Sequence, residues 1–253
     1  MSGHSKWATI KRQKAVTDAK RGAVYARMSR EIIVATKQGG PDRDGNFRLR
    51  QAIDRAKAEG VPNENIERAI EKGSGAGASD NVEELTYEGY GPGGVAILVK
   101  CATDNRNRTA GDIRSYFSKH GGNLGDTGCV NWMFKERGEI QIDREKSFDE
   151  EALLSAASDA GAEDLLTDDP TEALVICSSD KLEVVKNAVE KSGHKVISAE
   201  VNMTPMTTVS VQDPDIAKHL LKLLDALENQ DDVQQVYANF DMDEQLLREF
   251  VSN

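Results

Sequence analysis

One continuous stretch decides the fold class: residues 138–203 read GEIQIDREKSFDEEALLSAASDAGAEDLLTDDPTEALVICSSDKLEVVKNAVEKSGHKVISAEVNM. Extended and helical periodicities alternate along it in the order β-α-β-β-α-β. The predicted strands are 138–143, 162–168, 172–178 and 196–203, and the predicted helices are 148–161 and 181–193. This order is typical of a ferredoxin-like domain.

The segments on either side of this stretch complement one another. VEELTYEGY and GVAILVKCA flank a GPGG turn, which predicts a hairpin from residue 82. Thr109 and Asp112 resemble a capping box that opens a helix ending at Gly121. Beyond Pro205, TTVSVQ, DPDIAKHLLKLLDALENQ and VQQVYANF predict a strand, a helix and a strand. We expect them to complete the sheet begun at residue 82, with the ferredoxin-like unit inserted in it.

The first third of the chain is predicted to be helical. Apolar residues recur at helical spacing from Thr17 to Gly39, with Thr17 or Asp18 as the cap, and then up to Gly60 and up to Gly73. A stretch rich in small residues follows, as expected of a linker. We therefore predict an α+β protein with an N-terminal helical bundle and two α+β domains. The predicted boundaries are 1–74, 75–133 with 206–253, and 134–205.

Composition restricts the class of protein. The chain has 253 residues, of which 38% are hydrophobic and 30% charged, and no run approaches the length of a membrane span. Its three cysteines, Cys101, Cys129 and Cys177, lie far apart and form no disulfide framework. The N-terminus has no apolar signal region. These features predict a soluble, cytoplasmic protein that does not bind membranes.

Charge is divided unevenly along the chain. Residues 1–73 carry 16 Lys and Arg against 9 Asp and Glu, whereas residues 74–253 carry 16 against 34, although the whole chain has a net charge of −11. A basic end on an acidic protein indicates a nucleic-acid or other acidic partner.

Residue patterns typical of enzymes are missing. The four histidines, His4, His120, His194 and His219, lack the spacing of a metal site. The acidic loop from Asp42 has Phe47 and Ile53 where a calcium loop needs glycine and glutamate. The glycines of GYGPGG match no nucleotide-binding loop. We expect no catalysis, no metal, no cofactor and no small-molecule substrate.

Basic residues near the N-terminus form the main candidate site. They are interspersed with Trp7, a mixture suited to phosphate contacts and to stacking on an exposed base. The alternative is a solvated helix face on which Trp7 is a packing anchor. The candidate nucleic-acid-binding residues are His4, Lys6, Trp7, Lys11, Arg12, Lys14, Lys20, Arg21, Arg27 and Arg30.

A second polar and basic site is predicted in the loop before the helix at residue 109. Arginines next to helix amides make an anion site, although the same arginines could instead satisfy local carbonyls and carboxylates. Asn123, in the glycine-rich loop after that helix, can donate and accept hydrogen bonds without charge. The candidates are Asn105, Arg106, Asn107, Arg108 and Asn123.

Several of these motifs together resemble one family. GHSKWATIK, DAKRG, FRLRQAIDRAKAEGVP, EGYGPGG, DNRNRT and SKHGGNLG, spread in this order over the chain, are similar to the YebC family, which includes the mitochondrial translational activator of cytochrome oxidase subunit one. The resemblance implies a helical N-terminal domain, two α+β domains and no enzymatic activity.

The function implied by the resemblance is divided. Bacterial members are described as DNA-binding transcriptional regulators, while members of both groups resemble ribosome-associated factors that ease translation through proline runs. A single basic end on an acidic chain suits backbone contact with folded RNA better than palindromic DNA readout. We therefore expect a partner in ribosomal RNA or DNA, with the ribosome preferred. A protein-binding adaptor is the second alternative.

Overall fold

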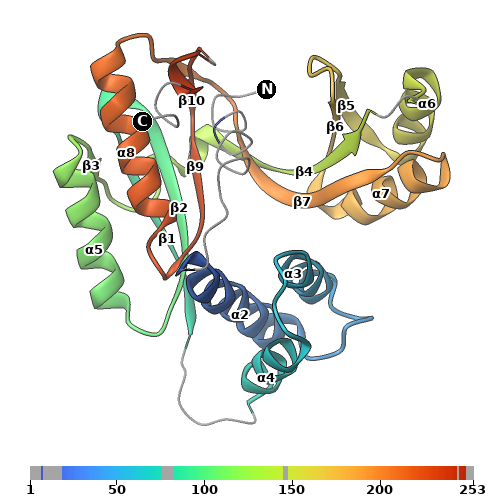
Figure 1. Ribbon diagram of the computed structural model, residues 1–253, viewed down its shortest axis with the longest axis horizontal. Helices are drawn as coiled ribbons and strands as arrows, with labels where there is room; N and C mark the ends of the chain where they lie inside the picture. The colour runs from blue at the N-terminus through green and yellow to red at the C-terminus, as the bar shows by residue number, and fades with distance from the viewer. Residues whose placement is uncertain (1–6, 8–18, 76–81, 145–147, 244, 249–253) are drawn as a thin grey trace. The chain divides into compact units, whose positions relative to one another are not determined.

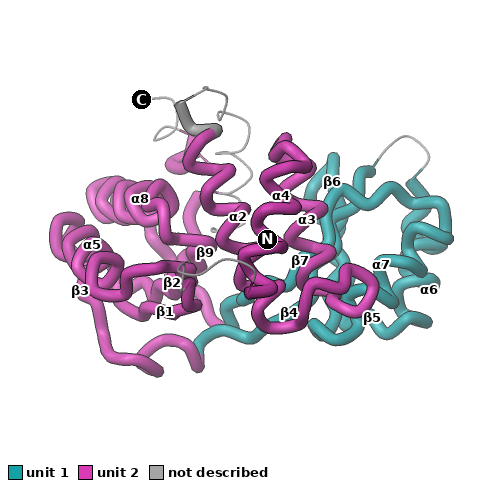
Figure 2. Tube along the Cα trace, turned by 90° about the horizontal axis from the view of Figure 1, so that it is seen from below, with its two compact units in different colours: residues 1, 133–206 teal, residues 2–132, 207–253 magenta. Residues whose placement is uncertain are grey.

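The computed structural model describes residues 7, 19–75, 82–144, 148–243 and 245–248 (Figure 1). They divide into two compact units (Figure 2). The smaller unit holds Met133–Met206, and the larger holds the described residues before and after it. No helix among the described residues is long and apolar enough to cross a membrane.

The smaller unit has the ferredoxin-like arrangement predicted from the sequence. Its sheet has the order β5-β6-β4-β7, and neighbouring strands are antiparallel. The helices α6 and α7 connect the strands as expected. The elements are β4 (Phe134–Asp143), α6 (Glu150–Ala160), β5 (Ala162–Leu166), β6 (Glu172–Cys177), η3 (Ser179–Lys181), α7 (Leu182–Lys191) and β7 (Val196–Pro205).

Local sequence explains how these elements begin, end and pack. The Asp149 side chain caps α6 by accepting a hydrogen bond from the amide of Ala152, and Gly161 ends the helix in the left-handed conformation. Alternate residues of β4, Ile140 and Ile142, are fully buried, as is Leu153 of α6. One face of the sheet is therefore packed by apolar side chains, which is what the period-two pattern predicts.

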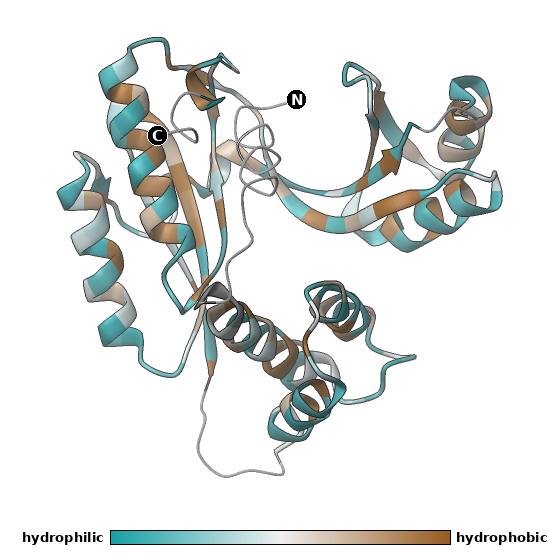
Figure 3. Ribbon diagram, viewed as in Figure 1, coloured by the Kyte–Doolittle hydropathy of each residue, from teal (hydrophilic) through white to brown (hydrophobic). Residues whose placement is uncertain are grey.

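The larger unit contains the second α+β arrangement. Its sheet has the order β3-β1-β2-β9, and α5 and α8 lie side by side on one face (Figure 1). Hydrophobic residues run along β2 and α8 (Figure 3) and form the core. The elements are β1 (Glu83–Tyr90), η1 (Pro92–Gly94), β2 (Ala96–Thr103), α5 (Arg106–Lys119), β3 (Asn123–Leu124), η2 (Asn131–Met133), α8 (Pro214–Glu228) and β9 (Val233–Ala238).

The predicted hairpin and the return of the chain to its sheet are confirmed. β1 pairs antiparallel with β2 across a turn in which Gly93 and Gly94 have φ angles of 74° and 75°, values that favour glycine. β9 pairs antiparallel with β2, although it follows the inserted unit in the chain.

One predicted strand does not join this sheet. Only Val209–Ser210 of TTVSVQ is extended, as β8, and it pairs in parallel with β10 (Phe240–Asp241) in a separate two-stranded sheet. It is β9 that pairs with β2, where Ile97 lies opposite Ala238. The amide of Val209 instead donates to the carbonyl of Asn239.

Three helices form the predicted N-terminal bundle: α2 (Ala19–Gly39), α3 (Phe47–Ala58) and α4 (Asn63–Gly73). Its core contains Ile32, Leu49 and Ile66, all almost completely buried, and extends to Val82 and Ala102 at the ends of the hairpin strands. The Asn46 side chain caps α3 by accepting from the amide of Leu49. The α+β class is confirmed, while the boundary predicted at residue 74 stays a prediction because both sides belong to one unit.

Candidate nucleic-acid interface

The basic N-terminal residues are only partly described by the structure. His4, Lys6, Lys11, Arg12 and Lys14 lie outside the described residues, as do the predicted caps Thr17 and Asp18. Lys20 and Arg21 belong to the first turn of α2. Trp7, Arg27 and Arg30 are described individually, and each makes contacts within the larger unit.

Trp7 is a packing residue. Only 1% of it is exposed, and it belongs to the core formed by the sheet, α5 and α8. Its indole nitrogen donates to Oε1 of Glu228 at 3.3 Å. A side chain buried in this way cannot stack on an exposed base, so the structure corrects the stacking role and favours the alternative of a packing anchor.

Arg27 and Arg30 attach α2 to the loop between α8 and β9. Arg27 donates to the carbonyl of Glu228 at 3.3 Å, and Arg30 donates to the carbonyl of Asp231. Arg30 also lies 3.5 Å from a carboxylate oxygen of Asp232. Both guanidinium groups therefore have acceptors inside the protein, which sequence patterning could not reveal because the loop lies about two hundred residues away along the chain.

Asp232 is the centre of this contact. It is 1% exposed, and its carboxylate accepts from Nη2 of Arg108 at 2.9 Å and from the hydroxyl of Thr109 at 2.7 Å. Burial opposes ionisation, but these hydrogen bonds and the charges of Arg30 and Arg108 outweigh it and lower the pKa of Asp232. The ionised carboxylate thus joins α2, α5 and the α8–β9 loop.

In the predicted second site, two residues make contacts within the protein. Asn105 caps α5 by accepting from the amide of Arg108, and Arg108 pairs with Asp104 and Asp232. The expected capping box of Thr109 and Asp112 is wrong: α5 begins at Arg106, and Thr109 is buried in its first turn. Arg106, Asn107 and Asn123 are exposed.

Three further arginines in the helical bundle also have internal partners. Arg43 pairs with Glu67, Arg48 pairs with Glu84 of β1, and Arg55 pairs with Glu31 at 2.8 Å. The six Lys and Arg of residues 1–21 face a single acid, whereas residues 22–73 carry ten Lys and Arg against eight acids. The positive surplus is therefore concentrated before residue 22.

The sequence did not predict a further cluster of hydrogen bonds, which surrounds Glu88 of β1. This glutamate is 4% exposed, and its carboxylate accepts from the backbone amides of Gly128, Val130 and Asn131 at 2.7 to 2.8 Å. Burial alone would raise the pKa of Glu88, but the three amides outweigh it and lower that pKa. The sequence does not distinguish Glu88 from the other two acids of β1, Glu83 and Glu84, because the partners of Glu88 are backbone groups.

Comparison with known proteins then identifies the family. Residues 5–76 match the TACO1/YebC protein N-terminal domain, and residues 82–240 match the TACO1/YebC second and third domain. The chain belongs to the TACO1/YebC family.

Relatives in this family align over nearly the whole chain. A probable transcriptional regulatory protein of Synechococcus sp. (strain JA-2-3B'a(2-13)) is 52% identical over 98% of both chains. Another of that description, from Desulfotalea psychrophila, is 51% identical over 98% of this chain and 99% of its own. The crystal structure of a conserved hypothetical protein from Aquifex aeolicus matches with a TM-score of 0.80 and 46% identity, covering 89% of this chain and 92% of that one.

No nucleophile is activated among the thiols of this TACO1/YebC family member. Burial, and then the Asp232 carboxylate, raise the pKa of Cys101 to about 12. Burial raises the pKa of Cys177 to about 11 and, to a lesser extent, that of Cys129. Cysteines with raised pKa values are poor nucleophiles at neutral pH.

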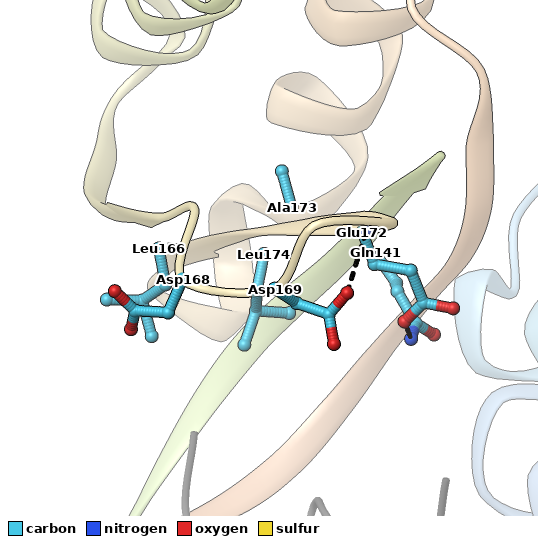
Figure 4. A pocket seen from close by; sticks show the side chains of 7 residues that line it. All are labelled: Gln141, Leu166, Asp168, Asp169, Glu172, Ala173 and Leu174. Carbon is cyan, nitrogen blue, oxygen red and sulfur yellow. Dashed lines mark hydrogen bonds between the residues drawn. The ribbon is translucent and has the colours of Figure 1, made fainter. Parts of the chain in front are cut away.

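We also searched the described residues of this TACO1/YebC chain for a metal site, a catalytic histidine and a pocket. Within the described residues no cluster of His, Cys, Asp and Glu is suited to a metal ion. His194 bonds to the Ser192 hydroxyl and the Asp149 carbonyl, so it joins two loops. A hollow beside Asp169 and Leu174 (Figure 4) has a volume of about 30 Å³.

Proposed function

We propose that this chain is a non-enzymatic, nucleic-acid-binding regulator of gene expression that works in the cytoplasm as a ribosome- or RNA-associated translation factor. Its task would be to ease translation through difficult sequences such as proline runs. Its partner would be ribosomal RNA within the ribosome, with no membrane and no small-molecule substrate involved.

The observation that carries the proposal is the uneven distribution of positive charge along the chain. Arg27, Arg30, Arg43, Arg48 and Arg55 all have acceptors within the protein. The segment before residue 22 has six cations and one acid. Such a segment gains by releasing counterions from a phosphate backbone, which needs no base sequence.

The helices support backbone contact rather than sequence-specific DNA readout. α3 carries three arginines, and a recognition helix would need such side chains free to reach base edges. Here Arg48 is held by Glu84, Arg50 by the carbonyls of Arg43 and Asp44, and Arg55 by Glu31.

A DNA-binding transcriptional regulator is the second candidate. Its support is the name of the relatives, which are called probable transcriptional regulatory proteins. A competition experiment distinguishes the two: the full chain, bound to labelled ribosomal RNA, is challenged with equal phosphate concentrations of unlabelled RNA and duplex DNA. Stronger competition by RNA supports the translation factor, and stronger competition by DNA supports the transcriptional regulator.

The decisive test is sedimentation of cell lysate on a sucrose gradient with and without ribonuclease. We expect the protein to travel with ribosomes and to return to the top of the gradient after ribonuclease treatment or at high salt. A protein that stays at the top in both lysates contradicts the proposal. Salt-resistant association that survives ribonuclease would instead favour a protein-binding adaptor.

A further inference from the structure

Trp132 is unusually exposed for a tryptophan in an ordered loop. It is 64% exposed, and Tyr90 beside its loop is 36% exposed, whereas Trp7 is 1% exposed. A large aromatic ring left in water forgoes the stabilisation that burial would give it. The fold therefore gains little from this ring, and its exposure calls for a partner outside the chain.

The exposure of Trp132 does not come from a loose loop. The buried Glu88 carboxylate holds the amides of Gly128, Val130 and Asn131, and the Glu88 carbonyl accepts from the amide of Gly125 at 2.8 Å. Val130, two residues before the tryptophan, is fully buried. A ring presented from so firmly bonded a loop loses little conformational entropy when it binds a partner.

The polar atoms of both rings are already occupied. The Trp132 indole nitrogen donates to the carbonyl of Cys129 at 3.1 Å, and the Tyr90 hydroxyl donates to the same carbonyl at 3.2 Å. Only the ring faces and edges remain available. A nucleobase can stack on such a face without needing a donor from the rings themselves.

We propose that Trp132, with Tyr90 beside it, is a stacking platform for an unpaired base of single-stranded nucleic acid. The proposal rests on the nucleic-acid-binding function proposed above and adds a base contact to it. Two exposed amides flank the platform: Asn123 lies opposite Tyr90 in the pairing of β1 with β3, and Asn131 precedes the tryptophan. Their side chains can donate to and accept from a base edge.

Tryptophan fluorescence tests the platform directly in the full chain. Because Trp7 is buried, quenching by acrylamide in the native protein reports mainly on Trp132. We expect short oligouridine to protect the tryptophan from acrylamide, with oligothymidine as the arm that separates RNA from DNA. An RNA duplex or a proline-rich peptide should give no protection. Protection by the peptide but not by either single strand would overturn the proposal.

Variants provide the second measurement. Trp132→Ala should weaken oligouridine binding by about 5- to 150-fold, the effect expected for loss of one stacked base, while Trp132→Phe should retain most of it. Leu154→Ala, which truncates another residue that is 53% exposed, is the matched control and should bind normally. Folding of each variant is checked by thermal unfolding.

The outcomes separate this proposal from the general function. If Trp132→Ala binds oligouridine as tightly as the native chain does, the platform is wrong even when ribosome association persists. If the native chain shows neither quenching protection nor affinity for single strands, the platform is equally rejected. If stacking is observed but the protein never sediments with ribosomes, the platform stands and the ribosome assignment fails.

Discussion

The guanidinium of Arg108 on α5 binds the buried carboxylate of Asp232 in the loop before β9, with Nη2 at 2.9 and 3.1 Å from the two oxygens. Residues 124 positions apart in the chain are thereby held together beside Arg30 of α2. The contact connects the helical bundle to the sheet and decides whether the arginine is free for a ligand.

Arg108→Ala should destabilise the protein. It leaves the buried Asp232 without its closest cationic partner, while Thr109 continues to donate, so we expect a loss of about 1 to 3 kcal/mol in the free energy of unfolding. Asp104→Ala removes the other, exposed partner of Arg108 and should cost less than about 1 kcal/mol. Urea unfolding of both variants measures the difference, and equal effects would contradict a structural role for the buried pair.

Stability should decrease in acid because two buried carboxylates have lowered pKa values. The folded pKa values of Asp232 and Glu88 lie below those of the unfolded chain, so both groups stabilise the fold fully above about pH 5. This stabilisation is lost as the pH falls through the folded pKa values. The free energy of unfolding, measured from pH 6 downward, should fall less steeply in Asp232→Asn and Glu88→Gln than in the native chain. Parallel curves would exclude these groups as the cause.

Charges before and after residue 22 should behave differently when removed. Replacing Lys11, Arg12, Lys14, Lys20 and Arg21 by alanine should leave stability intact. The slope of log affinity against log salt should decrease by about 0.7 to 0.9 for each phosphate that the variant no longer neutralises.

The matched variant Arg27→Ala with Arg30→Ala removes two charges that have internal acceptors. It should lower the melting temperature and leave most of the salt slope in place. An unchanged salt slope in the variant with five replaced residues would contradict the role of the charges before residue 22. A double variant of Arg27 and Arg30 with normal stability and a much reduced slope would show that these two arginines bind phosphate instead.

The two tryptophans should differ in their effect on stability. Trp7→Ala should cost about 3 to 5 kcal/mol because it removes a fully buried ring. Trp132→Ala should cost less than about 1 kcal/mol because its ring is mostly in water. Chemical unfolding followed by circular dichroism compares the two. A small effect at Trp7 would argue against its place in the core.

The exposed loops should contribute to function without anchoring the protein. Arg106 and Asn123 are exposed, and neither belongs to the ion pair that engages Arg108 with Asp232. Replacing Arg106 and Asn123 together by alanine should leave ribosome sedimentation mostly intact but reduce translation through a proline-rich reporter. Full reporter output from the folded variant would reject this role, and loss of both signals would show that anchoring and action cannot be separated.

Much of the fold could be predicted because its signals are local. The alternation in Ile140 and Ile142, the Gly161 cap and the glycine turn between β1 and β2 are readable from neighbouring residues. The helix start at Arg106 was misjudged because Asn105 was a better cap than Thr109, whose hydroxyl is used by Asp232. Capping patterns show which residues are able to cap but not which have a stronger distant partner.

The sequence by itself determined the order of helices and strands, the insertion of one α+β unit into another and the concentration of positive charge before residue 22, because periodicity and composition depend on residues close together in the chain. Only the tertiary structure decided which charged and aromatic side chains are free. Trp7 and Trp132 are the same residue type, yet one is buried against α8 and the other is exposed. Arg30 and Arg108 meet Asp232 only through the tertiary fold. Burial and ion pairing depend on contacts between segments that are distant in the chain, and the pattern of residues along the sequence does not show these contacts.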